Sequence, residues 1–425
     1  MLYTEKIIQF GEGGFLRGFV DYMVQILNEE TDFAARAVVV QPIAEGACDL
    51  LEAQGCVYTH LCRGAQGVLE KRIEVIGRTV KPYDDFDAYL ALAEQDSFRF
   101  IVSNTTEAGI AFCEDDRFED RPASTFPAKV TQLLYRRFER GGRGFVFLPC
   151  ELIDKNGETL RDYILRYGEL WGLGEDFCRF VREENIFCNT LVDRINTGYP
   201  KGEPITLERA DDRLLNASEY FHLWVIEGYA DLFSEIPFDR VPSLNVILTD
   251  TLEKYRTRKV RILNGAHTSL VHYAMLEGFE TVGECMADAR MREHLKGCIY
   301  EEILPTLDLP KKELTDYADE VLCRFENPYI QHYLSSISLN SVSKFRVRVL
   351  PSILEYQKRF LKPPKRLLLS FAKLLEYYRT KEPNDDPRAV ELLRSATVRE
   401  ALAMRELWGT DLSEFAEVMM EYEDQ

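Results

Sequence analysis

The sequence has no uncharged apolar run that approaches the ~18 residues needed to cross a bilayer. Its first residues lead directly into a strand-like segment and show no signal-peptide pattern. Because both features are absent, we expect a soluble chain located in the cytoplasm, with no membrane partner.

Paired cysteine motifs are also lacking, since none of the ten cysteines forms a C-x-x-C pair. Several cysteines, such as Cys150 and Cys323, lie in apolar or strand-like runs, where a buried free thiol packs as a small hydrophobic group. We therefore expect neither a disulfide framework nor a zinc site.

Positive charge is in deficit. The 52 lysine and arginine residues stand against 71 aspartate and glutamate residues, which gives a net charge of −19. Binding to nucleic acid or to an anionic membrane requires a basic face that displaces counterions. The composition therefore argues against both partners.

The length of 425 residues predicts about two domains, at roughly 150 residues per domain with allowance for large ones. In the first third, apolar strand-like runs alternate with helical patterns, as a doubly wound parallel sheet requires. The expected strands are 6–10, 37–41, 99–105 and 144–149, and the expected helices are 15–29 and 126–140. The sequence thus predicts an α/β, Rossmann-like dinucleotide-binding domain over residues 1–245.

Beyond about residue 245 the pattern changes to the 3.6-residue periodicity of helices. The expected helices are 259–276, 287–304, 365–380 and 388–407. We therefore predict that residues 246–425 form an all-α domain that carries the substrate and catalytic groups. The pattern does not predict an oligomeric state.

A glycine-bearing turn, Gly11-Glu12-Gly13-Gly14-Phe15-Leu16-Arg17, follows the first expected strand and begins a helical pattern. Gly11 permits a tight turn, and Gly13 lets the backbone approach a pyrophosphate at the start of the helix. The third position of the G-x-G-x-x-G fingerprint is Leu16, so the generic pattern is incomplete. Alone, the turn is compatible with a dinucleotide site and with an ordinary strand-to-helix connection.

A polar trio, Lys259, Asn264 and His267, lies on a helical apolar stripe that includes Val260 and Leu263. At 100° per residue, Asn264 lies ~140° and His267 ~80° around an α-helix from Lys259, so the three can share one side. Apolar surroundings lower the pKa of a lysine toward neutrality, which suits proton exchange with an alcohol or carbonyl oxygen. The alternative is a solvated lysine, a capping or structural asparagine and a core histidine.

Both motifs resemble those of the mannitol dehydrogenase family of polyol-specific long-chain dehydrogenases. Its signature K-x-x-x-x-N-x-x-H is matched by the trio, and its opening G-x-G-x-F-x-R is matched by the glycine turn. Further matches span nearly the whole chain: Asn156-Gly157, Val192-Asp193-Arg194-Ile195, Trp224-Val225-Ile226-Glu227, Ser343-Lys344 and Glu406-Leu407-Trp408-Gly409.

Within the family, three segments resemble members that act on keto sugar acids: 103–109, 149–157 and 340–345. Members that act on mannitol or fructuronate usually carry C-D-N where this chain has Cys150-Glu151-Leu152. The resemblance implies reduction of D-tagaturonate to D-altronate by NADH in hexuronate catabolism, and the reverse oxidation. A related fructuronate or mannitol-type dehydrogenase and a non-catalytic dinucleotide-binding sensor are the alternatives.

The resemblance also implies roles for the catalytic residues. Lys259 donates a proton to the keto oxygen and acts as base in the reverse direction, and no metal is needed. Asn156 and Asn264 form an oxyanion-stabilising pair, and His267 holds a substrate oxygen.

For substrate binding, the resemblance implies that Asp193 accepts hydrogen bonds from sugar hydroxyls, although an Asp-Arg pair is often structural. Lys344 contacts the substrate on the far side. Two positions depart from the family pattern: Arg256 stands where a glutamate is usual, and Ser336 stands where an arginine is usual. A uronate needs local positive charge, for which Lys344, Arg346 and Arg348 are candidates and Arg194 is a weaker one.

The cofactor expected from the resemblance is NAD. The second strand ends in Gln41-Pro42 and offers no acidic residue there for the ribose, although Glu45 is nearby, and no arginine cluster is present for a 2′-phosphate. The residues alone therefore do not decide between NAD and NADP. The expected cofactor-binding residues are Gly11, Gly13, Gly14, Phe15, Arg17, Gln41, Asn104 and Thr105.

Overall fold

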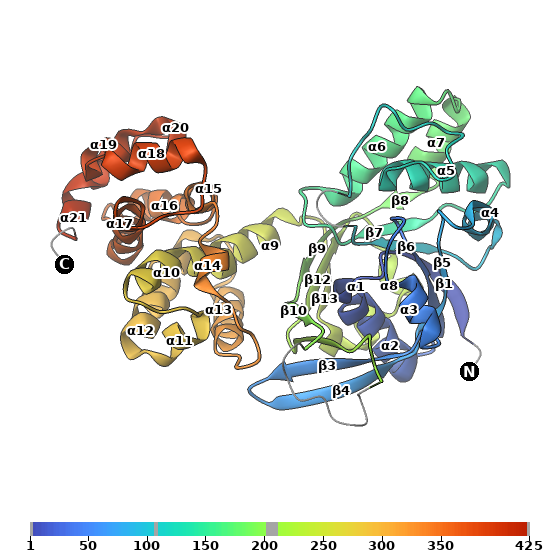
Figure 1. The fold of residues 1–425 in the computed structure, drawn as a ribbon, viewed down its shortest axis with the longest axis horizontal. Helices are drawn as coiled ribbons and strands as arrows, with labels where there is room; N and C mark the ends of the chain where they lie inside the picture. The colour runs from blue at the N-terminus through green and yellow to red at the C-terminus, as the bar shows by residue number, and fades with distance from the viewer. Residues whose placement is uncertain (1–2, 106–108, 201–210, 423–425) are drawn as a thin grey trace. The chain divides into compact units, whose positions relative to one another are not determined.

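The computed structural model describes residues 3–105, 109–200 and 211–422. The chain divides into two compact units, Met1–Leu252 and Glu253–Gln425, each of which is described by itself. All the named strands belong to the first unit, and the described part of the second unit is built of helices (Figure 1).

The main sheet of the first unit is parallel, with six strands in the order β5-β2-β1-β6-β7-β8. The strands are β1 (Thr4–Phe10), β2 (Ala35–Val40), β5 (Ile76–Val80), β6 (Phe100–Ser103), β7 (Val146–Pro149) and β8 (Ile186–Phe187). The order runs outward from β1 on both sides, so it reverses between β1 and β6, which is where such sheets bind ligands. The predicted doubly wound sheet is confirmed.

Both faces of this sheet are covered because its strands are apolar almost throughout. On one face, α1 (Gly14–Gly18) and α2 (Val20–Glu30) bury residues such as Leu16 and Met23 in the same cluster as Ile7 and Val39. On the other face, Ile8 packs in a cluster that includes side chains of three further helices. These are α5 (Phe126–Glu139), α6 (Asn156–Leu170) and α7 (Glu175–Glu183), which lie together on one side of the sheet in Figure 1.

Two smaller sheets and several short helices complete the first unit, and the sequence did not predict the sheets. One sheet has the order β10-β11-β3-β4, and the other has the order β13-β12-β9. Their strands are β3 (Tyr58–Gly64), β4 (Gly67–Ile73), β9 (Asn189–Asp193), β10 (Asn196–Gly198), β11 (Asn216–Glu219), β12 (Leu223–Glu227) and β13 (Val246–Thr249). The short helices are α3 (Cys48–Ala53), α4 (Phe86–Leu90) and α8 (Leu232–Glu235).

The second unit is helical, as predicted. Its helices are α9 (Glu253–Arg258), α10 (Gly265–Leu276), α11 (Val282–Ala287), α12 (Ala289–Gly297), α13 (Lys311–Phe325), α14 (Leu334–Ile337), α15 (Ser341–Arg348), α16 (Leu350–Phe360), α17 (Lys365–Thr380), α18 (Pro387–Ser395), α19 (Val398–Ala403), α20 (Arg405–Trp408) and α21 (Ala416–Met420). Two π-helical segments, Lys259–Asn264 and Cys298–Ile303, interrupt the α-helical geometry. The helix predicted over 365–380 is α17. The pattern over 388–407 is divided into three helices, because a capping box between Thr397 and Glu400 starts a new helix there.

No helix in the described part of the chain is both long and apolar enough to span a bilayer. All ten cysteines are free thiols, and Cys150 is buried as expected. The burial expected for Cys323 is wrong, because this residue lies on the exposed side of α13, whereas its neighbour Leu322 faces the interior.

Candidate active site

The glycine turn leaves the carboxyl end of β1 at the point where the strand order reverses. Gly11 has a φ of +118°, and a Cβ there would lie 3.1 Å from the Asn104 carbonyl oxygen, so this position requires glycine. A Cβ on Gly13 would meet no atom within 4 Å. The turn thus combines a conformation that glycine permits with open space beside its backbone, and both features fit the approach of a pyrophosphate.

Two further glycines let the helix after the turn pack closely against β10 and β11. A Cβ on Gly14 would lie 2.9 Å from Asn196 Nδ2, and one on Gly18 would lie 2.6 Å from Asn196 Oδ1. Close helix packing is the role of the third glycine in the generic fingerprint. Here Gly14 and Gly18 take that role, and Leu16 is free to be a buried core residue.

Arg17 supports the glycine turn through two hydrogen bonds. Its Nε donates to the Glu12 carbonyl at 3.1 Å, and its Nη1 donates to the Leu214 carbonyl at 2.6 Å. The Gln9 amide supports the same turn through the Gly11 carbonyl, at 3.2 Å. These contacts give the arginine of the G-x-G-x-F-x-R motif a positioning role in the turn.

Asp21, on α2, is buried next to Gln9. Its Oδ2 accepts hydrogen bonds from Gln9 Nε2 at 3.4 Å and from the Tyr58 hydroxyl at 3.1 Å. Burial raises the pKa of the Asp21 carboxyl to about 7, although these hydrogen bonds and the charge of Arg17 act in the opposite direction. The carboxyl is therefore partly protonated at neutral pH.

This burial predicts a stability effect. The pKa of Asp21 in the folded chain exceeds the unfolded value near 4, so stability falls as the pH rises from about 4 to 7. The penalty above pH 7 is on the order of 4 kcal/mol. Asp21→Asn is expected to raise the free energy of unfolding in urea by about 2 to 4 kcal/mol at pH 8 and by little at pH 4.

A matched control is Glu30→Gln, which removes an exposed carboxylate at the end of the same helix. We expect this variant to change stability by less than about 0.5 kcal/mol. An Asp21→Asn protein no more stable than the parent at pH 8 would show that the buried carboxylate carries no such cost.

The loop after β2 is shaped by side chains that the sequence assigned to the cofactor. The Gln41 amide donates to the carbonyls of Ile43 and Ala44, at 3.0 and 3.1 Å, and accepts from the Cys48 backbone N–H at 3.2 Å. Its polar atoms are thus engaged within the loop, and the cofactor contact expected of Gln41 stays a prediction. Glu12 Oε1 accepts from the Ala47 N–H at 3.3 Å, which places a carboxylate at the edge of this loop.

At the next strand end, Asn104 and Thr105 follow β6 as expected and are held by a residue whose role the sequence analysis missed. Glu151 is buried, and its carboxylate accepts from the Ser103 hydroxyl at 3.0 Å and from the Thr105 backbone N–H at 2.9 Å. The Asn104 side chain donates to the Cys150 carbonyl at 3.3 Å. An acidic residue directly after a buried strand was the available signal for Glu151.

The side-chain amide of Asn156 is hydrogen-bonded on both its nitrogen and its oxygen. Its Nδ2 donates to the carbonyls of Pro149, Glu151 and Thr190 at 3.0 to 3.1 Å. Its Oδ1 accepts from the backbone N–H groups of Gly157 and Thr190, at 3.0 and 2.8 Å. This buried amide ties the start of α6 to β7 and β9, and its hydrogens are already used. These hydrogen bonds favour a structural role for Asn156, and the oxyanion contact stays a prediction.

Asp193 ends β9 and is buried, with its backbone paired to Leu223 of β12. The next residue, Arg194, donates to the Gly18 carbonyl at 2.5 Å and to the Glu219 carbonyl at 2.9 to 3.1 Å. Arg194 therefore serves the interior of the first unit, which argues against a contact with a substrate carboxylate.

The second unit carries the polar trio on a helix whose first part is not α-helical. Residues Lys259–Asn264 form a π-helix, and α10 begins at Gly265. In a π-helix the hydrogen bonds join residues five apart, which is the spacing between Lys259 and Asn264. The two side chains therefore lie closer to one face than the ~140° of an α-helix implies.

Neighbouring arginines anchor the π-helix to the helices around it. Arg258 pairs with Glu313 of α13 at 2.7 Å, and Arg261 donates to the Ser352 hydroxyl of α16 at 2.7 Å. A Cβ on Gly265 would lie 3.1 Å from the Arg348 carbonyl, so glycine allows α15 to approach the helix closely. These contacts fix the segment that carries Lys259.

Asn264 is half-buried, and its side chain makes no capping hydrogen bond to α10. Within the described residues its amide has no hydrogen-bond partner. His267 is buried, stacks on Phe325 with ring centroids 4.1 Å apart, and leaves its Nε2 without a partner among the described residues. Burial lowers the pKa of His267 well below its usual range, so the ring is neutral. Asn264 is therefore not a capping residue, and His267 is not a core histidine with all its polar atoms hydrogen-bonded.

The candidate substrate cations all lie on α15. The Lys344 ammonium donates to the Ile337 carbonyl at 3.0 Å, while Arg346 lies against Gly409, where a Cβ would be 3.2 Å from its Nη2. Ser336, which replaces the usual arginine, is exposed on α14, and Arg256 is half-buried on α9.

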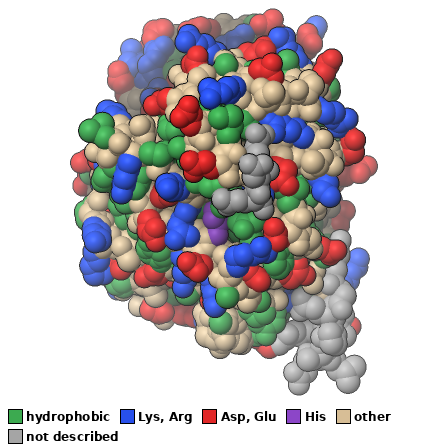
Figure 2. All heavy atoms as spheres, turned by 90° about the vertical axis from the view of Figure 1, so that its left-hand side faces the viewer, with side chains coloured by type: hydrophobic (Ala, Val, Ile, Leu, Met, Phe, Trp, Pro, Cys, Tyr) green, Lys and Arg blue, Asp and Glu red, His purple; other side chains and the backbone are tan. Residues whose placement is uncertain are grey.

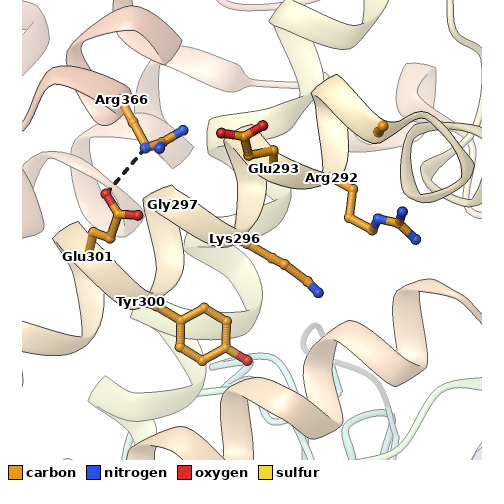
Figure 3. Close-up of a pocket in the computed structure, with 8 residues that line it drawn as sticks. Arg292, Glu293, Lys296, Gly297, Tyr300, Glu301 and Arg366 are labelled. Carbon is orange, nitrogen blue, oxygen red and sulfur yellow. Dashed lines mark ion pairs between the residues drawn. The ribbon is translucent and has the colours of Figure 1, made fainter.

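A separate pocket of about 370 Å³ opens on the second unit and contains none of these residues. Figure 3 shows it, with Arg292 and Lys296 extending away from an ion pair between Arg366 and Glu301, whose atoms are 3.5 Å apart. A Cβ on Gly297 would lie 2.1 Å from Arg366 Nε, so this glycine makes room for the guanidinium. The charges of this pocket are of both signs, which gives no preference for one ligand.

Comparison with known families matches residues 5–237 to the mannitol dehydrogenase Rossmann domain and residues 251–425 to the mannitol dehydrogenase C-terminal domain. The altronate oxidoreductase of Yersinia enterocolitica serotype O:8 / biotype 1B is 48% identical over 389 residues, which cover 89% of this chain and 80% of the relative. The altronate oxidoreductase of Escherichia coli O6:K15:H31 is 46% identical over the same shares of the two chains.

Two solved structures share the fold at 22% identity. A substrate-free D-sorbitol dehydrogenase has a TM-score of 0.83, and the match covers 99% of this chain and 93% of that one. A ternary complex of Pseudomonas fluorescens mannitol 2-dehydrogenase with NAD and D-mannitol has a TM-score of 0.70, with 99% and 91% covered.

Proposed function

The chain belongs to the mannitol dehydrogenase family, and we propose that it catalyses the NADH-dependent reduction of D-tagaturonate to D-altronate and the reverse oxidation. The observation that carries this proposal is the 48% identity to an altronate oxidoreductase over 89% of the chain. The presence of Lys259, Asn264 and His267 on one helical segment supports a catalytic protein over a dinucleotide-binding sensor, because a sensor needs no proton-transfer lysine.

In the proposed reaction, Lys259 gives a proton to the keto oxygen and takes it back from the hydroxyl in the oxidation. The free amide of Asn264 donates to the same oxygen as negative charge develops there, and neutral His267 holds a neighbouring substrate oxygen. Asp193 accepts from a sugar hydroxyl. When bound, the reduced nicotinamide supplies the hydride for the keto carbon.

The residues of the first unit fit a dinucleotide, and they favour NAD over NADP. Gly11 and Gly13 leave open backbone beside the turn, and Asn104 and Thr105 line the neighbouring strand end. Glu12 is directed to the loop after β2, and residues 41–50 include Glu45 but no lysine or arginine. A 2′-phosphate there would be repelled by the carboxylates of Glu12 and Glu45, whereas a 2′-hydroxyl would find acceptors.

A substrate panel tests the proposal. Purified protein is mixed with NADH or NADPH and, in turn, with D-tagaturonate, D-fructuronate and D-fructose, while nicotinamide absorbance is followed. We expect turnover with NADH and the highest kcat/KM for tagaturonate. Preference for fructuronate or fructose would redirect the proposal to another member of the family, and NADH binding without any turnover would favour the sensor.

Lys344 provides a prediction about substrate binding. Its ammonium already donates to a backbone carbonyl, and Asp385 lies close enough to offset part of its charge. We therefore expect it to hold a sugar oxygen and not to provide the main attraction for a carboxylate. Lys344→Met is expected to raise KM about tenfold for tagaturonate and for a neutral ketohexose alike, with NADH affinity unchanged.

The measurement is a pair of steady-state titrations at low salt, together with NADH binding by fluorescence. Lys358→Met, which removes an exposed lysine from the next helix, is the control and should leave all constants unchanged. An unaltered KM for both substrates would remove Lys344 from the binding site.

A further inference from the structure

The guanidinium of Arg348 is half-buried at the end of α15 and lacks a counterion. Among the described residues it makes no ion pair and donates no hydrogen bond, and burial lowers its pKa. The buried arginines described above have acceptors: Arg258 pairs with Glu313, and Arg194 donates to backbone carbonyls. A cation withdrawn from water without an acceptor is costly, which indicates that its partner is a bound anion.

Basic side chains lie around Arg348 and His267. Lys344 lies one turn earlier on the same face of α15. The charge of Arg348 lowers the pKa of Lys344, and the charge of Lys344 lowers the pKa of His272. Arg348, Arg324 and His332 all lower the pKa of His267, after burial itself. We refer to His267, Arg324, His332, Lys344 and Arg348 as the Arg348 cluster.

The cluster contrasts with the rest of the molecule. The chain has a net charge of −19, and on the face drawn in Figure 2 Lys and Arg side chains are interspersed with Asp and Glu. Asp385 offsets part of the charge of Lys344. The cations Lys344 and Arg348, one turn apart on α15, attract an anion locally even though the protein as a whole is acidic.

The cluster also lies where the proposed substrate must be held. α15 packs against both α10 and the π-helix, the two segments that carry Lys259, Asn264 and His267. In a keto sugar acid of this kind the carboxylate ends the carbon chain remote from the ketone. It therefore needs a receptor distinct from the lysine that protonates the keto oxygen.

We propose that Arg348 receives the carboxylate of the sugar acid and is the residue that separates sugar acids from neutral ketoses. This inference rests on the proposed function. The planar guanidinium can donate two parallel hydrogen bonds to a carboxylate, which the ammonium of Lys344 cannot do. Arg324 adds positive charge near His267, on which Arg348 also acts.

The test uses Arg348→Met, which keeps an apolar stem and removes the charge, and Arg348→Lys, which keeps the charge and removes the planar fork. For Arg348→Met we expect KM for D-tagaturonate to rise about 10- to 100-fold, with little change in KM for neutral D-tagatose. Arg348→Lys should recover part of the loss. NADH affinity should be unchanged in both variants.

The matched control is Arg346→Met. This arginine is two residues away on the same helix but faces Gly409, so its removal should leave KM for both substrates within about twofold. An unchanged KM for tagaturonate in Arg348→Met would overturn the inference. An equal rise for tagaturonate and tagatose would also overturn it, because it would reveal a packing effect.

The wild-type protein separates failure of the inference from failure of the proposed function. Turnover of tagaturonate by the wild type with an unaffected Arg348→Met variant would sink only the inference. Absence of turnover on any sugar acid would sink the proposed function, and binding then decides the inference. D-altronate should raise the unfolding temperature of the NAD-loaded wild type and fail to do so in Arg348→Met, whereas equal shifts in the two proteins would overturn the inference.

Discussion

Lys259→Ala is expected to lower kcat about 10²- to 10⁴-fold while leaving NADH affinity unchanged. Lys259 is the first residue of the π-helix, and the proposed reaction needs its proton on the keto oxygen in the same step as hydride arrives. Alanine keeps the helix and removes the acid, so substrate and cofactor should still bind. Steady-state kinetics at saturating NADH, together with NADH titration by fluorescence, measures both quantities.

The control for this variant is Lys254→Ala, which removes an exposed lysine from α9, immediately before the π-helix. It should retain nearly full activity. A Lys259→Ala enzyme with near-normal kcat would remove this lysine from the mechanism, and a large loss of NADH affinity would assign it to cofactor binding instead.

The π-helix shows both the reach and the limit of sequence analysis. The spacing of Lys259, Asn264 and His267 along an apolar stripe was sufficient to predict one helical face. The assumption of 100° per residue nevertheless placed Asn264 ~140° from Lys259, which is an awkward position for joint action on one oxygen. The i→i+5 geometry reduces that separation, and no local pattern in the sequence signals a π-helix.

Strand ends were predictable because their physical cause is local. Apolar β-branched runs with glycine after them identify strands of a parallel sheet, so the positions of Gly11, Asn104 and Thr105 followed from the chain itself. The small sheets built from β3, β10 and β11 were not predictable in this way. The pairing of β3 with β11 joins residues as far apart in the chain as His60 and Asn216, which no periodicity along the chain specifies.

The hydrogen-bond partners of individual side chains could not be predicted from the sequence. Gln41 and Arg17 were expected to bind the cofactor, yet the side chains of both form hydrogen bonds with backbone groups. Glu151, by contrast, accepts a hydrogen bond from the Thr105 N–H, although from the sequence this residue served only to compare the chain with other family members. Which polar atoms remain unpaired depends on tertiary contacts, so a motif gives a residue's location before it gives its role.

The two asparagines illustrate this distinction and lead to opposite predictions. Asn264→Ala is expected to lower kcat about 10²- to 10³-fold, with unchanged NADH affinity and unchanged stability, because its amide has no partner within the described fold. The isosteric Asn264→Asp should be at least as slow, since it places a carboxylate beside the developing oxyanion. Both kcat values come from the tagaturonate assay.

Asn156→Ala should instead act on stability. It leaves the carbonyls of Glu151 and Thr190 and the Thr190 N–H without their buried partner, at about 1 to 3 kcal/mol for each unsatisfied group. We expect its free energy of unfolding in urea to fall by several kcal/mol, and the folded fraction to retain most of its kcat. A stable but inactive Asn156→Ala protein would restore Asn156 to the oxyanion site. If the Asn264→Ala protein were in addition destabilised but active, both assignments would be reversed, because each amide would then have the role we give to the other.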